Sequence, residues 1–230
     1  MTTIQGNRCA ASFQYIPELM KVSVVVPAYN EASRIGAVLE PLASCPSVDE
    51  VIVVDDGSDD GTAQVASRPG VEVVSLEQNR GKAAALDEGI SRARNDVVFF
   101  LDADLVGLTA AHVERMIAAY VDGKTDMVVG VFANGRMNTD IAQKINPFAS
   151  GQRLISKTLW ERAKEYVGEM DYGIEIALSK LAVKEGWKTE KVKLPGVTHI
   201  LKEEKRGLGK GLRDRLKMYG DMLKWLIKKV

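Results

Sequence analysis

The sequence predicts an α/β fold: a Rossmann-like, open and mostly parallel sheet with helices on both faces. Between Lys21 and Val131, short runs of β-branched residues alternate with segments of helical periodicity, repeating at roughly 25-residue spacing. Polar clusters follow four of these runs, namely PAYNE, DDGSDD, QNRGK and DADL. Because ligands bind beyond the carboxyl ends of the strands in such sheets, we expect the four clusters to share one rim.

The first two repeats are bounded by recognisable signals. KVSVVVP is a β-branched run that ends near Pro27, as expected for a strand buried on both faces. NEASRIGAVLEPLAS has apolar residues at helical spacing, and Pro41 should distort the end of that helix. EVIVVDD predicts a second buried strand, and SDDGTAQVAS predicts a second helix with Ser58 or Asp59 as its N-cap.

The next two repeats follow the same order. VEVVSL predicts a third strand and NRGKAAALDEGISRA a third helix. DVVFFLDAD predicts the fourth strand, TAAHVERMIAAYV the fourth helix and DMVVGVF a fifth strand. His112 falls in the fourth helix, where a surface or packing role is the simplest interpretation.

The regular pattern stops after Val131, so residues 132–209 are expected to form a second half of the same domain. ANGRMNTDIAQKINPFASGQ predicts loop and short helix, LISKTLWERAKEYV and DYGIEIALSKLAVKEG predict two helices, and WKTEKVKLPGV predicts a strand. Residues 1–20 show no clear period and predict a poorly ordered lead-in. Residues 210–230 predict a C-terminal basic amphipathic helix, which would pack on the domain, pair in a homodimer or lie on a membrane.

The composition narrows the class of protein. Of the 230 residues, 46% are hydrophobic and 27% charged, and the 31 Lys and Arg balance the 31 Asp and Glu. This balance gives no indication of nucleic acid as a partner. Cys9 and Cys45 have no metal-ligand spacing and suggest no disulfide framework, which favours a reducing cytoplasm. No run approaches the ~18 apolar residues that a membrane span needs, so a soluble or membrane-peripheral chain is expected.

The stretch VVFFLDADLVG contains the most unusual pair of residues. Alternate residues of a strand share a face, so Asp102 and Asp104 are predicted to point to the same side at the carboxyl end of a buried strand, where their like charges would repel. A divalent cation such as Mg²⁺ or Mn²⁺ relieves such repulsion, because these ions prefer carboxylate oxygens and often share them with phosphate. The alternative is a solvated turn at the strand end, where aspartate is also common.

Two other clusters have side chains suited to a nucleotide. Tyr29 is able to stack on a base and Glu31 to bond its edge or a ribose, although both also suit an ordinary helix entry. Gly81 would let a phosphate approach the backbone amides at a helix start, and Lys82 would add positive charge. The alternative for this second pair is a solvated basic cap.

The motifs VSVVVPAYNE, VIVVDDGSDDGT, NRGKAAAL and FLDADL, in this order and spacing, resemble the family 2 glycosyltransferases and their GT-A-fold relatives. The resemblance covers residues 21–131 and marks them as a nucleotide-sugar-binding half, with 132–209 as the acceptor-binding half. It implies that one aspartate of the Asp55–Asp56 pair binds the base, and Asp56 is favoured. The residues implied in contacting the base and ribose of a UDP- or GDP-sugar are Pro27, Tyr29, Glu31 and Asp56.

The same resemblance resolves the two open alternatives near the phosphates. It implies that Lys82 lies near the diphosphate and that Asp104 ligates Mg²⁺ or Mn²⁺ directly. Asp102 would contact the ribose, or the ion through water. A metal site is then favoured over a simple turn.

Two later segments resemble the retaining GT-A synthases of glucosyl-3-phosphoglycerate and mannosylglycerate. In those enzymes a late histidine completes the metal site, which implies His199 as a ligand, whereas a lone histidine is otherwise more often structural. The Tyr-Gly-x-Glu stretch in DYGIEI implies that Glu175 faces the reacting sugar, with Asp171 and Tyr172 beside the acceptor. Acids favoured by a helix dipole explain that stretch equally well. The catalytic candidates are Asp104, Glu175 and Lys82.

The segment SGQRLISK also resembles the acceptor side of those synthases. It implies that Arg153 or Lys157 holds an anionic acceptor. DADLVGL departs from the DADLQxP of polyprenyl-phosphate sugar transferases, and no ED-type pair follows the fifth predicted strand. Both departures favour the retaining synthases over the inverting, lipid-linked branch.

The sequence therefore predicts a metal-dependent enzyme that moves a hexose from a nucleoside-diphosphate sugar to a small, anionic hydroxyl acceptor with retention. An inverting polyprenyl (dolichyl)-phosphate sugar transferase is the first alternative. A non-catalytic nucleotide-sugar-binding protein is the second. VPAYNEAS lacks the glycine fingerprint of dinucleotide-dependent oxidoreductases, and no Gly-rich loop with Arg and Lys opens the chain as in sugar nucleotidyltransferases.

Overall fold

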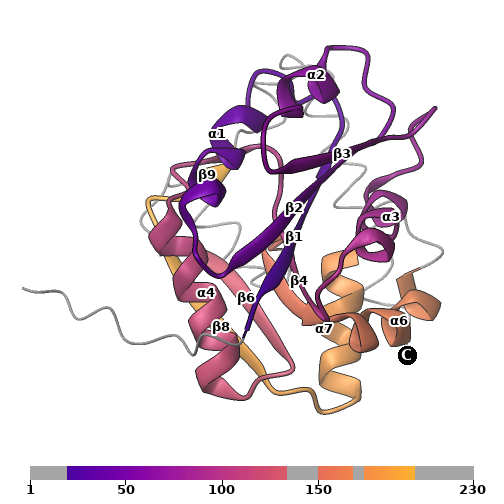
Figure 1. Ribbon diagram of the computed structural model, residues 1–230. Helices are drawn as coiled ribbons and strands as arrows, with labels where there is room; N and C mark the ends of the chain where they lie inside the picture. The colour runs from indigo at the N-terminus through magenta and orange to yellow at the C-terminus, as the bar shows by residue number, and fades with distance from the viewer. Residues whose placement is uncertain (1–19, 134–149, 168–173, 200–230) are drawn as a thin grey trace, which may run out of the picture.

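A computed structural model of the chain describes residues 20–133, 150–167 and 174–199, and it confirms the predicted α/β fold. In this part of the chain a seven-stranded sheet has the order β3-β2-β1-β4-β7-β6-β8, and β5 pairs separately with β9 (Figure 1). The strands are β1 (Val22–Ala28), β2 (Val48–Asp55), β3 (Val71–Ser75), β4 (Val97–Phe100), β5 (Leu105–Val106), β6 (Met127–Ala133), β7 (Arg153–Ser156), β8 (Thr189–Pro195) and β9 (Thr198–His199).

The sheet is parallel except for one inserted strand. β1 pairs in parallel with β2 and β4, β2 with β3, and β6 with β8. β7 runs antiparallel between β4 and β6, with Phe100 opposite Arg153 and Val97 opposite Ser156. The helix expected from Leu154 onward is therefore wrong at its start, because the run RLIS completes the sheet before the helix begins. Ser156 marks the change, since its Oγ accepts a hydrogen bond from the backbone N–H of Leu159 at 3.2 Å.

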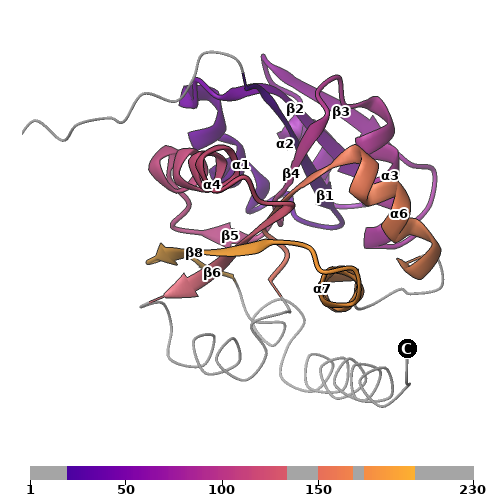
Figure 2. The ribbon, with the colours of Figure 1, turned by 90° about the horizontal axis from the view of Figure 1, so that it is seen from below.

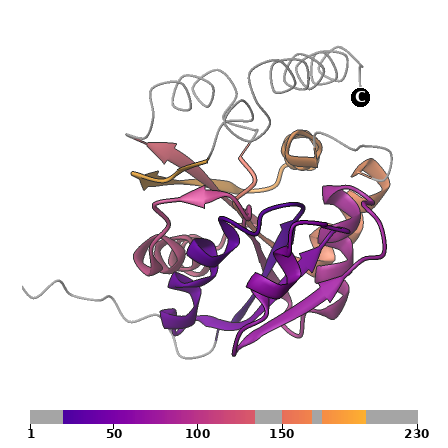
Figure 3. The same ribbon diagram turned by 90° about the horizontal axis from the view of Figure 1, so that it is seen from above.

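Helices cover both faces of the sheet, as expected. Figures 2 and 3 show α1 and α4 on one side, and α3 and α6 on the other. The helices are α1 (Ile35–Leu39), η1 (Pro41–Ser44), α2 (Thr62–Ala66), α3 (Lys82–Arg92), α4 (Ala110–Gly123), α6 (Lys157–Val167) and α7 (Ile174–Lys184).

The sequence pattern of β1 explains the two cores. Val24 and Val26 pack with α1, α2 and α4 in one hydrophobic cluster, while Val25 packs with α3, α6 and α7 in the other. Alternate residues of a strand point to opposite faces, so a continuous valine run suits a strand covered on both sides. The ring of Phe100 meets that of Trp160 edge-on, with centroids 5.4 Å apart, which joins β4 to α6.

Two local expectations are refined. The first helix ends at Leu39 and continues as a 3₁₀ turn from Pro41, which agrees with the predicted effect of that proline. Neither Ser58 nor Asp59 caps the second helix, so that prediction is wrong. The side chain of Asp60 contacts the first turn of this helix instead. Its Oδ1 accepts hydrogen bonds from the backbone N–H of Thr62 at 3.0 Å and from the Thr62 hydroxyl.

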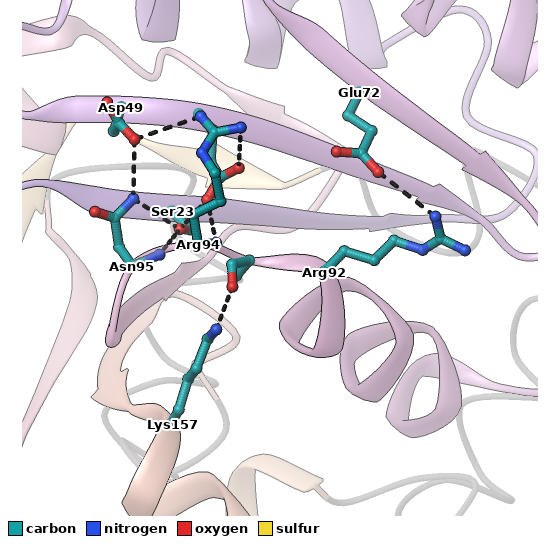
Figure 4. Close-up of polar contacts among 9 residues, drawn as sticks. Ser23, Asp49, Glu72, Arg92, Arg94, Asn95 and Lys157 are labelled. Atoms are coloured by element: carbon teal, nitrogen blue, oxygen red, sulfur yellow. Dashed lines mark hydrogen bonds and ion pairs between the residues drawn. The ribbon is translucent and has the colours of Figure 1, made fainter.

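A polar network joins the amino ends of the strands, at the edge of the sheet where β1 and β2 begin (Figure 4). The carboxylate of Glu50 accepts hydrogen bonds from the Ser23 hydroxyl and the Arg94 backbone N–H, and Asn95 donates to the Ser23 oxygen at 3.0 Å. Lys157 donates to the carbonyl of Ala93 at this same end. Because β7 is antiparallel, Lys157 lies beside the amino end of β4. Its predicted contact with an acceptor at the opposite rim is therefore wrong.

Several predictions lie outside the described residues. They concern the lead-in up to residue 19, Asp171 and Tyr172, and the helix expected over 210–230. Among the described residues, no helix combines the length and apolar character needed to cross a membrane.

Candidate active site

The predicted polar clusters follow β1, β2 and β4 at one edge of the sheet, where the carboxyl ends of these parallel strands lie. At this rim the Nζ of Lys82 donates to the carboxylates of Asp102 and Glu175, at 2.6 Å in each case. Lys82 opens α3, Asp102 follows β4, and Glu175 lies in the first turn of α7. Three of the predicted functional residues therefore meet at one ammonium group, although Lys82 and Glu175 are 93 positions apart in the sequence.

The charges in this cluster depend on one another. Burial alone would lower the pKa of the Lys82 ammonium, but the charges of Asp102 and Glu175 and their hydrogen bonds raise that pKa above its usual range. Burial alone would raise the pKa of Asp102, yet Lys82, His199 and the hydrogen bond from Gln152 hold it below its usual range. The cluster thus keeps a cation and an anion side by side at neutral pH.

The two aspartates of DAD are not on a strand. β4 ends at Phe100, and Asp102 and Asp104 lie in the turn that leads to β5. The argument that strand alternation points both carboxylates the same way is therefore wrong. Asp102 is instead fixed by its contacts: Lys82 binds its Oδ1, and the side-chain amide of Gln152 donates to its Oδ2 at 2.7 Å.

A small second sheet brings the late histidine to the same region. β5 and β9 pair antiparallel, with Leu105 opposite His199, so the histidine lies across from the residue that follows Asp104. The ladder needs glycine at Gly107, because a Cβ there would lie 2.5 Å from the carbonyl oxygen of Gly196. Gly107 also has φ +79°, which favours glycine. The sequence around either strand gave no indication that β5 and β9 would pair.

The donor chemistry of these residues suits Mg²⁺ or Mn²⁺, which accept carboxylate oxygens and imidazole nitrogen. Among the described residues, however, no three Asp, Glu, His or Cys side chains converge closely enough to hold an ion. Both oxygens of Asp102 already have partners. Metal binding by Asp102, Asp104 and His199 stays a prediction, and it requires Lys82 to release Oδ1 of Asp102 and the other two side chains to approach that oxygen.

The acidic pair after β2 fixes the neighbouring loop. Asp56 is buried, and its two oxygens accept hydrogen bonds from the backbone N–H groups of Arg80 at 2.7 Å and Gly81 at 2.9 Å. Asp55 accepts one from the N–H of Ser58 at 3.1 Å. The predicted contact of Asp56 with a base is untested. In this structure its carboxylate holds the residues that immediately precede Lys82.

The segment after β1 leaves one aromatic side chain exposed. Tyr29 is 40% exposed, so its ring is accessible to a stacking partner. Glu31 is nearly buried and forms an ion pair with Arg34 at 2.9 Å, while its N–H donates to Thr62 Oγ1. Pro27 lies within β1. Stacking of a base on Tyr29 is compatible with this arrangement and stays a prediction.

Arg153 lies in the core although it was predicted to contact an acceptor. Its side chain is 1% exposed, and its guanidinium donates to the Ser150 carbonyl at 2.9 Å and to the Ser179 hydroxyl at 3.0 Å. Burial lowers the pKa of Arg153 to about 10, against the raising effect of Glu175 and Asp102. In this structure Arg153 is buried among these contacts, and contact with an acceptor would require it to be uncovered.

Sequence reasoning missed Gln152 as a member of the site. The only signal was its place in SGQR, immediately before a short apolar run. Its contact with Asp102 depends on the antiparallel insertion of β7 beside β4. The insertion of β7 depends on pairing with strands that are distant in the sequence, and local periodicity gives no information about such pairing.

Comparisons with known proteins place the chain in a family. The sequence model described as Glycosyl transferase family 2 matches residues 23–180. The undecaprenyl-phosphate 4-deoxy-4-formamido-L-arabinose transferase of Edwardsiella ictaluri is 32% identical over 155 residues, which cover 63% of this chain and 46% of that protein. The glucosyl-3-phosphoglycerate synthase of Mycolicibacterium paratuberculosis is 33% identical over 126 residues, covering 51% and 38%.

A solved structure shows the same likeness in three dimensions. It is the glucosyl-3-phosphoglycerate synthase of Mycobacterium tuberculosis in complex with Mn²⁺ and UDP-glucose, with a TM-score of 0.67 and 26% identity, covering 87% of this chain and 78% of that one. The aligned part of this chain spans less than half the length of either curated relative. The family match nevertheless covers well over half of this chain, and the sheet and helices agree with the solved structure. This chain therefore belongs to glycosyl transferase family 2 and has the GT-A fold.

Proposed function

We propose that this chain transfers a hexose from a nucleoside-diphosphate sugar to a hydroxyl acceptor, with Mg²⁺ or Mn²⁺ as cofactor. The observation that carries the proposal is the meeting of Lys82, Asp102 and Glu175 at the carboxyl rim of the sheet. The position suits a ligand of an open α/β sheet, and the similar synthase structure contains Mn²⁺ and UDP-glucose.

Different residues of the chain would contact the base, the diphosphate and the sugar of the donor. Tyr29, which is exposed, would stack on the base, and Asp56 holds the loop that leads into α3. Lys82 stays cationic because its pKa is raised, so its ammonium is able to exchange one carboxylate partner for a diphosphate oxygen. Glu175 would then face the reacting sugar from the start of α7.

The metal would be held by Asp104, with Asp102 and His199 as further ligands. When bound, the ion would offset the negative charge that grows on the departing nucleoside diphosphate. Carboxylates and imidazole are suitable donors for either metal. Lys82 would place a positive charge beside the same diphosphate. A fixed positive charge of this kind stabilises the negative charge that develops in the transition state.

A small, anionic hydroxyl acceptor is our first choice, with retention at the anomeric carbon. The likeness to a glucosyl-3-phosphoglycerate synthase over 87% of this chain supports it. The second candidate is a polyprenyl phosphate with inversion. It is favoured by the relative whose name gives undecaprenyl phosphate as acceptor, which matches 63% of this chain.

The test is a donor and acceptor panel with the purified chain. UDP- and GDP-sugars are offered with Mg²⁺ or Mn²⁺, and release of nucleoside diphosphate is measured with 3-phosphoglycerate or a short polyprenyl phosphate in detergent. The first choice predicts release that depends on the small acceptor, and proton NMR should show a retained anomeric configuration. Release only with the lipid, or an inverted product, would favour the second candidate. Nucleotide-sugar binding without any transfer would favour a non-catalytic binding protein.

A further inference from the structure

We propose that Gly151 and Gln152 are positioning residues that fix the carboxylate of Asp102, and through it the geometry of the metal and diphosphate site. This inference rests on the proposed function. It concerns two residues that join β7 to the functional rim and that have no other evident role in catalysis. Asp102 is 25% exposed at its side chain, so without such contacts it would be able to rotate into solvent.

Gln152 binds the carboxylate oxygen that Lys82 does not. Its Nε2 donates to Asp102 Oδ2 at 2.7 Å, while Lys82 occupies Oδ1 at 2.6 Å. The exposed fraction of Gln152 is 0%, so no water competes for this amide. The buried donor on Oδ2 therefore holds the carboxylate in one rotational orientation even when Lys82 releases Oδ1 to a metal ion.

The orientation of the Gln152 amide is itself determined. Its Oε1 lies 2.9 Å from the Ser150 hydroxyl, which also contacts the carbonyl of Gly130 in β6. The Gly130 N–H donates to the backbone carbonyl of Gln152 at 2.9 Å. If the amide were flipped, its Oε1 would face the Asp102 carboxylate and that hydrogen bond would be lost, whereas the Ser150 hydroxyl is able to pair with either end of the amide. The carboxylate of Asp102 thus selects the donor end of the amide, and the contacts with Ser150 and β6 hold the amide in place.

The backbone of Gly151 also restricts the position of the Asp102 carboxylate. A Cβ at this position would lie 2.4 Å from Asp102 Oδ2 and 2.6 Å from Oδ1. The backbone of Gly151 therefore lies directly against the carboxylate, and any side chain there would push Asp102 out of place. Such contacts behind a metal-binding carboxylate tune metal affinity, and losing one typically costs about 10- to 100-fold.

The experiment follows Mn²⁺ binding in the presence of saturating UDP, by the electron paramagnetic resonance signal of free Mn²⁺. Gln152→Met keeps the buried volume but removes the donor, and Gly151→Ala adds the displacing methyl group. Both are expected to raise the Mn²⁺ dissociation constant by about 10- to 100-fold. UDP affinity in EDTA should change by less than about twofold, because it does not need the ion.

One control variant and one further test variant separate positioning from stability. Ser23→Ala removes a buried hydroxyl at the opposite end of the sheet, so it should lower the melting temperature and leave Mn²⁺ affinity unchanged. Ser150→Ala removes the hydroxyl that contacts the Gln152 amide, and it should weaken Mn²⁺ binding less than Gln152→Met. It serves as the second variant should Gln152→Met fail to fold.

The outcomes distinguish this inference from the proposed function. Folded Gly151→Ala and Ser150→Ala proteins that bind Mn²⁺ as tightly as the wild type would overturn the positioning role alone. A wild-type chain with no UDP-dependent Mn²⁺ binding would overturn the proposed function and this inference together. Equal losses in Ser23→Ala would show that general stability, and not the contact with Asp102, sets the affinity.

Discussion

At the scale of single residues, Lys82 is the most informative position, because one ammonium group pairs with two carboxylates. Lys82→Met should lower kcat/KM for the sugar donor by about 100-fold, which corresponds to about 2.7 kcal/mol. Steady-state kinetics measures the change. Lys164→Met is the matched control, since Lys164 pairs with Asp87 and Glu161 away from the rim and should leave kcat/KM unchanged. Wild-type kinetics in Lys82→Met would exclude a role for this ammonium.

A second residue-scale prediction concerns pH. Burial, followed by the charge of Arg115, lowers the pKa of His112 below its usual value. In the unfolded chain this imidazole takes up a proton as pH falls through about 6.5, while the folded chain resists until the lower pKa is reached. The free energy of unfolding should therefore fall between pH 7.5 and 5.5.

The variant His112→Gln should lose this part of the pH dependence. Urea unfolding at the two pH values gives the comparison, and the difference between wild type and variant isolates the contribution of His112 from that of other groups. The same fall in both proteins would show that the imidazole is not the group responsible.

At the scale of elements, the start of α3 depends on the loop that Asp56 holds. Asp56→Ala would leave the N–H groups of Arg80 and Gly81 without these partners, which should cost about 1–3 kcal/mol of stability and weaken UDP binding. Faster hydrogen exchange at these two amides is the specific readout. In Asp59→Ala both amides should exchange as in the wild type, because the hydrogen bond at Asp59 uses its backbone. Unchanged exchange in Asp56→Ala would mean that other contacts hold the loop.

The β5–β9 ladder gives a second prediction at this scale. Gly107→Ala would drive a methyl group into the carbonyl of Gly196 and push β9 away, so Mn²⁺ affinity should fall by about tenfold if His199 is a ligand. Gly186→Ala is the matched control, since Gly186 also has positive φ but no atom within 4 Å of an added Cβ. Both variants carry backbone strain, and only Gly107→Ala displaces the ladder. Equal Mn²⁺ affinities in the two variants would contradict the placement of His199.

Elements with a strong local pattern were predictable from the sequence. The valine runs of β1 and β2 and the long amphipathic α4 have the periodicity that their burial requires. β7 was not predictable, because its four residues merge with the helical pattern of α6. Its strand conformation depends on pairing with β4 and β6, whose positions local sequence does not specify.

At the scale of the whole molecule, the convergence of polar clusters on one rim could be predicted, but their pairing could not. Parallel strands place their carboxyl ends together, which brings Lys82 and Asp102 to one edge. The contact with Glu175 depends on how α7 packs on the sheet, and the contact with Gln152 on the inserted β7. Both arise from residues distant in sequence, so only the folded chain reveals them.

In the proposed function, this rim of the sheet binds a nucleoside diphosphate through a divalent ion. The direct measurement is calorimetric titration of UDP into the wild type and into Asp104→Ala, each with Mn²⁺ and with EDTA. We expect Mn²⁺ to strengthen UDP binding by the wild type, Asp104→Ala to lose at least about tenfold of this gain, and the two proteins to bind UDP alike in EDTA. Mn²⁺-dependent UDP affinity that is unchanged in Asp104→Ala would contradict metal binding at this rim.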